Sequence, residues 1–503
     1  MARTEPGTIL ITGAKLVDPA KRRAEPADVL VTDGIIRAVG TGLAAPADAR
    51  VEDASGLLIH PGLINAHTHG HGGLARGQAD RWTLESLLAA GPWTNGGRSL
   101  ADKKLSVRIC AAEMALKGVT ACYDLYSEVP LPSVEGMDAA AEAYAEVGLR
   151  AVIAPMVADR TVFDAIPGLM DALPDPLRRR VEALRPAGFE AALAVMAEIL
   201  RGWRWSSADI RPAVAPTIPL HCADAFMCGC QRLAAEHGVG LHSHVAESKL
   251  QALAGVKRYG RTLVAHMDAL GLVGPQFTAA HGIWLTDDDL RIMAAKGASI
   301  AHNPGSNMRL GNGMFRLRRA LDLGVNVGVG TDGVSSSDTS NMYEAIRAAF
   351  QLAAVQTPDP ALWASAEEVW NAATIGSARA LGFGDIGAIA PGMKADIVFL
   401  DLAHPHYMPM NGTVNQLVHA EDSTAIRHVM VGGGFIVRDR KLLTLDLAKL
   451  AREAEAARER LEALNAEKRE LFTLLDPVVR SFCPAFAAEP YPVRRYLCDI
   501  PGP

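Results

Sequence analysis

Two histidines separated by a single residue, His67 and His69, are the first feature of this 503-residue chain that could do chemistry. They follow the apolar run at 57–64, which is predicted to be a β-strand. Side chains at positions i and i+2 of a strand point to the same side, so the spacing predicts two imidazoles presented together. Taken alone, such a pair also arises by chance in cores and on surfaces.

Three further residues, His244, His281 and Asp332, each stand at the end of a different predicted strand. Any one of them alone could be a hydrogen-bonded core residue, but chance does not readily place a whole series at strand ends. The first pair, His244 and Asp332 together offer three imidazoles and one carboxylate, a ligand set suited to Zn²⁺ or Fe²⁺. A metal in such a site lowers the pKa of bound water to about 7, which makes a nucleophile at neutral pH.

Glu247 lies three residues beyond His244. This offset places a carboxyl group near the predicted metal without making it an obligatory ligand. A nearby acid is what a leaving group or a ring nitrogen needs as a proton donor. The alternative is an acidic residue at a helix start that interacts with the helix dipole.

Eight short apolar runs, separated by stretches of helical period, must position these residues. Eight strands alternating with helices predict a parallel barrel closed on itself, the (β/α)8 fold, whose active site lies at the carboxyl ends of the strands. The predicted strands are 58–64, 119–124, 151–155, 211–215, 240–244, 277–281, 299–302 and 325–330.

Both ends of the barrel region carry strand-like sequence. The run 28–39 is predicted to be a hairpin around Asp33-Gly34. The runs 395–400 and 426–437 are also short, apolar and strand-like. We therefore expect one small composite β-domain from 1–60 and 388–444, a catalytic barrel over 61–387, and a helical extension over 445–503.

The extension carries Leu and Ala at three- and four-residue steps among charged residues, from Leu447 to Leu475. This pattern predicts an amphipathic helix of about eight turns that ends near Pro477. Lys468 interrupts the apolar stripe, as polar residues do in coiled-coil seams, so a homodimer or higher homo-oligomer is expected. The alternative is a helix packed against its own barrel.

Composition excludes several classes of protein. The chain has 50 basic and 56 acidic residues, and this balance predicts no nucleic-acid partner. Apolar runs are too short for a membrane helix, and the first ten residues do not resemble a secretory signal. Seven cysteines without a CxxC pair indicate reduced thiols and a cytoplasmic location.

The motifs HPGLINAHTHGHGGLARG, HSHVAES, AAHG, AHNPGSNMRLGNG and GVGTDG occur in this order. Together they resemble the amidohydrolase superfamily, in the branch of the triazine hydrolases and the guanine, cytosine and methylthioadenosine/S-adenosylhomocysteine deaminases. The resemblance runs from about residue 8 to 440 and implies a barrel with a composite β-sandwich. It also implies metal ligands at His67, His69, His244 and Asp332.

By the same resemblance, Glu247 and His281 are the pair that handles protons and orients the attacking hydroxide. Binuclear relatives carry a bridging lysine, and no lysine ends the predicted strand at 211–215. One divalent ion per chain is therefore expected, with zinc favoured and iron as the alternative. Candidate substrate contacts are Trp93, His302 and Asn307.

Two departures from the family concern the substrate. Nucleoside deaminases of this branch carry an acid after the first barrel strand that can hold ribose hydroxyls, and the stretch 91–98 here has none. They also share a histidine after the fourth strand, where this chain has Thr217. Both departures argue against adenosine-type substrates.

The expected function is hydrolysis of a non-peptide C–N bond in a small nitrogen heterocycle, most simply a deamination. Its partners are then the substrate and water, with Glu247 protonating a ring nitrogen and Asp332 accepting a proton from the attacking water. Alternatives in the same site are dehalogenation or dealkylamination of a triazine, or amide or urea hydrolysis. A more distant alternative is a barrel that has lost catalysis and serves in assembly.

Overall fold

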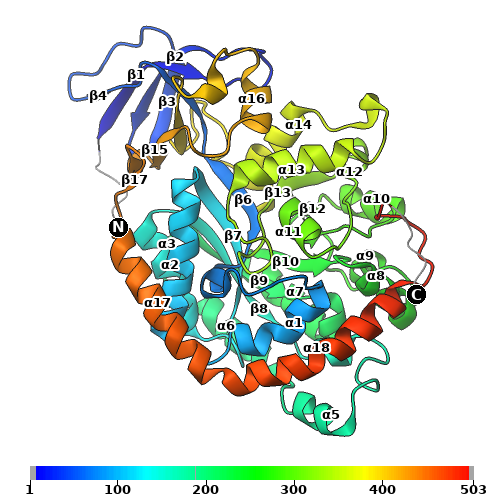
Figure 1. The fold of residues 1–503 in the computed structure, drawn as a ribbon. Helices are drawn as coiled ribbons and strands as arrows, with labels where there is room; N and C mark the ends of the chain where they lie inside the picture. The colour runs from blue at the N-terminus through cyan, green and yellow to red at the C-terminus, as the bar shows by residue number, and fades with distance from the viewer. Residues whose placement is uncertain (1–6, 187, 498–503) are drawn as a thin grey trace.

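The computed structural model describes residues 7–186 and 188–497. Its centre is a barrel of eight parallel strands, with a smaller sheet at one end and a bent helical arm along the outside (Figure 1). The barrel strands pair in the order β13-β12-β11-β10-β9-β8-β7-β6. They are β6 (Leu63–Thr68), β7 (Val119–Ser127), β8 (Arg150–Val157), β9 (Ile210–Pro216), β10 (Gly240–Val245), β11 (Phe277–His281), β12 (Ser299–His302) and β13 (Asn326–Val329).

The two outer strands, β6 and β13, meet through the turn that follows β13. The Asp332 amide donates to the His67 carbonyl oxygen at 2.9 Å, and Asn65 Nδ2 donates to Thr331 Oγ1 at 2.7 Å. The barrel therefore closes at the place where two of the predicted site residues lie. The predicted (β/α)8 fold is confirmed.

One predicted strand is wrong in its limits. The run 58–64 is divided between β5 (Leu57–Pro61), which joins the small sheet, and β6, which begins the barrel. Gly62 stands at the break, where a Cβ atom would lie 2.1 Å from Thr120 Oγ1. Apolar residues on both sides of this glycine gave a continuous pattern, but only a residue without a side chain fits where the chain changes sheets.

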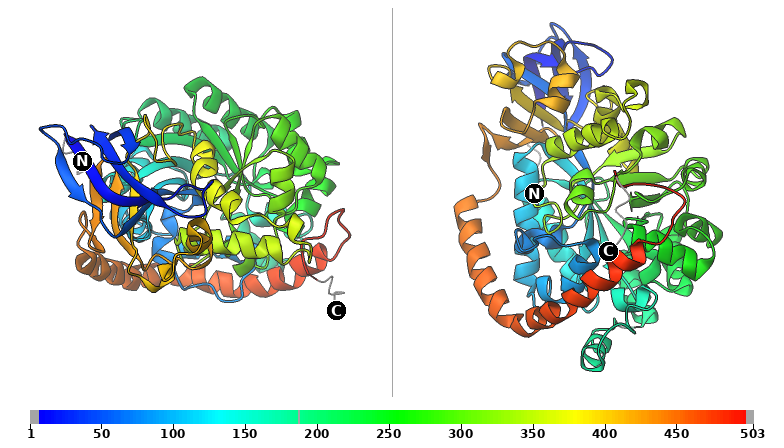
Figure 2. Two further views of the ribbon diagram at one scale, coloured as in Figure 1. Left: turned by 90° about the horizontal axis from the view of Figure 1, so that it is seen from above. Right: turned by 45° about the vertical axis from the view of Figure 1, so that its right-hand side comes forward.

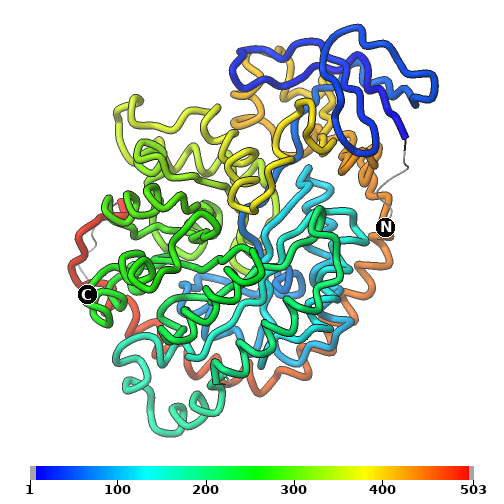
Figure 3. The backbone as a smooth tube through the Cα atoms, turned by 180° about the vertical axis from the view of Figure 1, so that it is seen from behind, coloured from blue at the N-terminus to red at the C-terminus, as the bar shows by residue number. Residues whose placement is uncertain are grey.

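The small sheet combines strands from both ends of the chain (Figure 3). The hairpin at Asp33-Gly34 is confirmed, with both residues at positive φ. The Ala395 amide donates to the Gly34 carbonyl oxygen at 2.8 Å, which curls the sheet around its own apolar core. Besides β5, its strands are β1 (Thr8–Leu16), β2 (Glu25–Thr32), β3 (Ile35–Gly40), β4 (Arg50–Asp53), β14 (Ile397–Asp401), β15 (Ile426–Val431), β16 (Gly434–Arg438) and β17 (Lys441–Leu442).

Helices surround the outside of the barrel (Figure 1). No helix of the described residues is long and apolar enough to cross a membrane. The helices before the arm are α1 (Leu84–Thr94), α2 (Leu100–Leu116), α3 (Val134–Val147), α4 (Val162–Ala165), α5 (Asp175–Glu182), α6 (Phe189–Arg201), α7 (Asp224–His237), α8 (Lys249–Tyr259), α9 (Leu263–Ala269), α10 (Asp287–Ala295), α11 (Pro304–Arg309), α12 (Leu317–Asp322), α13 (Met342–Ala354), α14 (Ala366–Asn371), α15 (Ser377–Ala380) and α16 (Thr413–His419).

The arm consists of two helices, α17 (Leu447–Leu464) and α18 (Ala466–Ala487), that bend at Asn465 and follow the barrel surface (Figure 2). The prediction of one helix ending near Pro477 is wrong, because α18 continues through Pro477 and Pro484. A proline removes one backbone hydrogen bond, but burial of the neighbouring apolar side chains against the barrel holds the helix together.

Much of the apolar stripe of the arm is covered by the barrel of the same chain. Leu450 and Ala457 of α17 are buried, as are Leu471, Leu475 and Val479 of α18. Helix α18 packs mainly on α1, where Ser86 Oγ donates to Asp476 Oδ1 at 2.7 Å. The buried part of the stripe therefore makes the intramolecular contact that the sequence left open, while Leu447 and Leu464 stay exposed.

A buried ion pair joins the small sheet to the barrel, and its loss should destabilise the fold. The guanidinium of Arg150, at the start of β8, donates to both Asp396 oxygens at 2.8 and 3.0 Å. Removing one partner leaves a buried charge uncompensated, so Arg150→Ala should lower the free energy of unfolding by about 3–5 kcal/mol. Thermal unfolding checks this, and an unchanged midpoint would show that water replaces the pair at no cost.

Candidate active site

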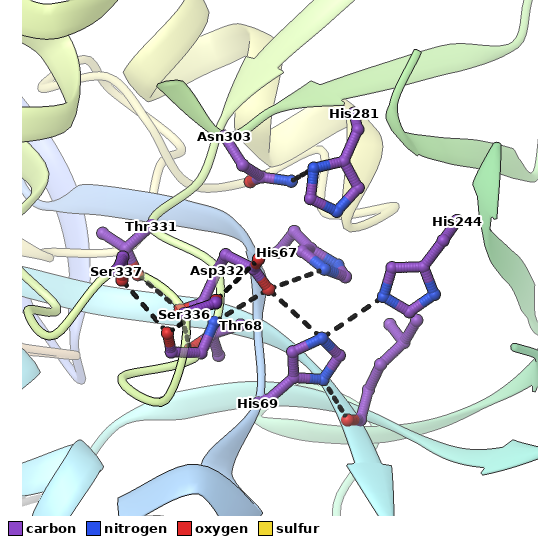
Figure 4. Close-up of polar contacts among 12 residues, drawn as sticks. His67, Thr68, His69, His244, His281, Asn303, Thr331, Asp332, Ser336 and Ser337 are labelled. Atoms are coloured by element: carbon purple, nitrogen blue, oxygen red, sulfur yellow. Dashed lines mark hydrogen bonds and ion pairs between the residues drawn. The ribbon is translucent and has the colours of Figure 1, made fainter. Parts of the chain in front are cut away.

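Four of the predicted site residues converge at the carboxyl ends of the barrel strands (Figure 4). Asp332 Oδ1 lies 3.3 Å from His67 Nε2 and 3.2 Å from His69 Nε2. His244 Nε2, at the end of β10, lies 3.2 Å from His69 Nε2. The four groups thus surround one point, although they are up to 265 positions apart in the sequence (332 − 67).

The outer nitrogens of two of these imidazoles are held by the backbone. His69 Nδ1 lies 2.7 Å from the Leu125 carbonyl oxygen, and His244 Nδ1 lies 2.6 Å from that of Thr217. A carbonyl oxygen only accepts, so each Nδ1 carries a proton, and in the neutral form of each ring Nε2 turns a lone pair inward. Hydrogen bonds of this kind fix the ring orientation and tautomer of metal-binding histidines.

Burial favours the neutral form of two imidazoles of the site. It lowers the pKa of His67 to about 3, and it lowers the pKa of His244 well below its ordinary value. A neutral imidazole is the form that binds metals. His67 and His244 therefore need no deprotonation to bind a metal near neutral pH. Burial also lowers the pKa of His69, but the hydrogen bond and the charge of Asp332 outweigh burial and raise it, so a metal ion would have to displace a proton from this ring.

Asp332 is held as an ionised carboxylate in a strained turn. Burial opposes its ionisation, but the contacts with His67 and His69 outweigh burial and hold its pKa well below the ordinary value. The Gly333 amide donates to Oδ1 at 2.8 Å and Ser336 Oγ donates to Oδ2 at 2.9 Å. Its backbone has φ 63°, a left-handed conformation that is uncommon for non-glycine residues.

Glu247 and His281 form a second pair beside the first four groups. His281 Nε2 lies 3.6 Å from Glu247 Oε2. Asn307 Oδ1 accepts from His281 Nδ1 at 2.9 Å, and Asn312 Nδ2 donates to Glu247 Oε1 at 3.0 Å. Burial, with the nearby Asp332 and Glu85 carboxyl groups, raises the pKa of Glu247 well above its ordinary value, which favours the protonated form of this side chain.

These residues form the floor of a pocket of about 330 Å³. Its walls are largely apolar and include Leu84, Leu88, Leu131, Met156, Val157 and Ile218. Two charged side chains also line it, but Glu128 pairs with Lys103, and Arg185 pairs with Asp164 at 2.8 Å.

The structure places the three predicted substrate contacts outside this pocket. Trp93 packs on Phe472 of α18, with ring centroids 5.7 Å apart, because its large apolar face is covered by the arm. His302 is fully buried beside Phe315, with centroids 5.0 Å apart. Asn307 lies one layer behind the pocket, where it orients His281.

Sequence reasoning missed two residues near Glu247. Asn312 lies in the quoted motif AHNPGSNMRLGNG, and its position there was the only signal. Glu85 is buried at the start of α1 and accepts from Ser248 Oγ at 2.8 Å. His242, which shares a strand with His244, lies against Tyr123 with ring centroids 4.5 Å apart and does not line the pocket.

The barrel and the grouped side chains define a class of protein, the metal-dependent hydrolases built on a (β/α)8 barrel. Within that class, the sequence model of the family described as "Amidohydrolase family" matches residues 58–436, and the chain belongs to this family. It is therefore a hydrolase that acts on carbon–nitrogen bonds.

Similar proteins cover almost the whole chain. A 5'-deoxyadenosine deaminase of Methanosarcina mazei is 31% identical over 459 residues, which cover 91% of this chain and 94% of that protein. A 5-methylthioadenosine/S-adenosylhomocysteine deaminase of Thermococcus onnurineus is 34% identical over 435 residues, covering 86% and 90%.

Solved structures of similar proteins have the same fold as this chain. An adenosine deaminase of Xanthomonas campestris with bound zinc superposes with a TM-score of 0.79 at 28% identity, covering 91% of this chain and 99% of that one. Atrazine chlorohydrolase of Arthrobacter aurescens, solved with zinc, gives a TM-score of 0.80 at 26% identity, covering 90% and 100%.

Proposed function

We propose that this chain is an aminohydrolase that uses one divalent ion, zinc or iron, held by His67, His69, His244 and Asp332. One observation carries the ligand assignment: His69 Nε2 and His244 Nε2 lie 3.2 Å apart, while both outer nitrogens donate to carbonyl oxygens. With both outer nitrogens occupied, the two Nε2 atoms are the nitrogens left to face a common cation, which would take the place of any proton held between them. No lysine lines the described pocket, which supports one ion instead of two.

The ion would act as a Lewis acid that lowers the pKa of water to about 7. The side chains supply the rest of the reaction. Asp332 accepts a proton from the attacking water, and the proton on Glu247 passes to the ring nitrogen as water adds to the amino-bearing carbon. His281, fixed by Asn307, orients the attacking oxygen. Asp332 then passes the proton it accepted to the amino group, the C–N bond breaks and ammonia leaves, and the proton of the added hydroxyl group returns to Glu247.

The pocket walls favour a heterocycle with an apolar substituent over a ribosylated one. The neutral side chains Thr94 and Asn95 line the stretch in which the sequence lacks an acid. Glu128 is the carboxylate among the described residues of the pocket wall, and it is already paired with Lys103 and Ser133. A ribose diol would therefore lose water without gaining a charged partner, whereas an alkyl or aryl group would be covered by leucine, proline and methionine side chains.

A hydrolysis screen tests both parts of this proposal. We expect ammonia release from amino-substituted pyrimidines, purines, pterins or triazines, with kcat/KM for alkyl- or aryl-substituted compounds at least about 10-fold above that for adenosine and 5'-deoxyadenosine. Preference for the nucleosides would overturn the substrate class but not the deamination. Release of chloride or alkylamine from triazines, without ammonia from any compound, would favour the alternative chemistry.

Metal analysis of the purified protein tests the stoichiometry. One divalent ion per chain is expected, and removal by a chelator should abolish turnover until zinc or iron is added back. Two ions per chain, both required for turnover, would contradict the assignment. A protein that binds no metal and hydrolyses nothing would favour the non-catalytic assembly alternative.

Other expectations also remain proposals. We propose the three-part division at 1–60 with 388–444, 61–387 and 445–503. The unpaired state of all six cysteines in the described residues supports the proposed cytoplasmic location. The homo-oligomer stays a prediction, to be checked by light scattering.

A further inference from the structure

The last described residues of the chain pack against the loops of the barrel beside the pocket. Arg495 is only 5% exposed. Its Nε donates to the Ile283 carbonyl oxygen and its Nη2 to that of Leu285, both at 2.6 Å. The planar guanidinium thus bridges two carbonyl groups of the segment that follows His281.

The backbone of the tail holds a second loop. The Arg495 carbonyl oxygen accepts from the Met314 amide at 2.8 Å. Gly313 has φ 108°, and a Cβ atom there would lie 3.1 Å from Arg495 Cβ, so the tail and this loop are in direct contact. One residue therefore joins the segment after β11 to the loop around Gly313.

Both loops lead directly to the proton donor. Trp284 Nε1 donates to the Asn312 carbonyl oxygen at 2.7 Å, and Asn312 Nδ2 donates to Glu247 Oε1 at 3.0 Å. Tyr496 covers the Trp284 ring, with centroids 5.1 Å apart. Arg495 thus holds the backbone on either side of Trp284, and hydrogen bonds run from Trp284 through Asn312 to Glu247.

We propose that Arg495 is a positioning residue for catalysis: it fixes the two loops so that Asn312 holds the Glu247 carboxyl group in place for proton transfer. This inference rests on the proposed role of Glu247. The C-terminal extension is then part of the catalytic apparatus and does more than cover an apolar surface.

Kinetics of Arg495→Ala, with the substrate that the screen identifies, test the proposal. We expect kcat to fall about 10- to 100-fold, the cost of a misplaced catalytic group, with KM changed less than about threefold and bound metal unchanged. Arg495→Lys, which offers one donor group instead of a fork, should recover part of the loss. Arg494→Ala removes the exposed neighbouring guanidinium and should leave kcat within about twofold.

The decisive comparison repeats Arg495→Ala in a Glu247→Gln background. If Arg495 acts through Glu247, the second substitution should add less than about threefold, because residues that act as a unit are non-additive. A purely structural role would give the same fold-loss in both backgrounds and would overturn the proposal.

Hydrogen exchange tests the loop contacts without any substrate. In Arg495→Ala, the segments 281–285 and 310–314 should exchange faster, while the rest of the barrel is unchanged. Unchanged exchange in both segments would overturn the inference even if deamination is established. Faster exchange in these segments, found in a protein with no hydrolytic activity, would support the loop contacts of Arg495 but would reject the proposed function.

Discussion

Replacing Glu247 with glutamine is expected to lower kcat at least about 100-fold while the divalent metal stays bound. Glutamine keeps the size of the side chain and can still bond with Asn312, but it has no proton to give to a ring nitrogen. That proton is needed only as the tetrahedral centre forms, so its loss acts on kcat more than on KM.

Steady-state kinetics and metal analysis on the same preparation measure the two halves of this result. Glu421→Gln is a matched control, because Glu421 is also a fully buried carboxyl group but accepts from Tyr407 and does not line the pocket. That variant should keep kcat within a few-fold. If Glu247→Gln loses its metal, Glu247 is a ligand; if it keeps full activity, the proton comes from elsewhere, and His281 is the next candidate.

Removing one of the proposed ligands should have the second large effect. His244→Ala is expected to weaken metal binding by more than the roughly 10- to 100-fold that loss of an outer hydrogen-bond partner costs, and to abolish turnover at limiting metal. Asp332→Asn should weaken the metal as well, and should also remove the group that accepts the proton of water. Metal titration monitored by calorimetry or by activity recovery measures both variants.

His242→Asn distinguishes the ligand from its neighbour on the same strand. Both histidines are buried on β10, but only His244 directs Nε2 at His69. The His242 variant should therefore bind one ion per chain as the parent does. Metal retained in His244→Ala and lost in His242→Asn would reverse the two assignments.

Much of the fold and the centre of the site could be predicted because the relevant signals are local. Each barrel strand is a short apolar run, and His244, His281 and Asp332 each follow their own run directly. Because parallel barrel strands end at one face, knowing that each residue closes a strand was enough to expect them together.

The parts that could not be predicted depend on contacts between distant segments. Trp93 was expected in the pocket, but the arm, nearly 400 residues further on, provides its aromatic partner Phe472. Likewise, Pro477 ordinarily ends a helix, and only packing of α18 against α1 explains why the helix continues. Nothing in the local sequence around Arg495 indicates that it contacts the loops beside Glu247.

The small sheet drawn from both chain ends has a consequence for how the protein is made. Leu58 of β5 pairs with Leu400 of β14, so 342 residues (400 − 58) must be synthesised before that ladder can form. At roughly 5–20 residues per second, the N-terminal strands wait on the order of 17–70 s on the ribosome with one edge unpaired. An open strand edge recruits other chains, so this interval is when the nascent protein most needs a chaperone.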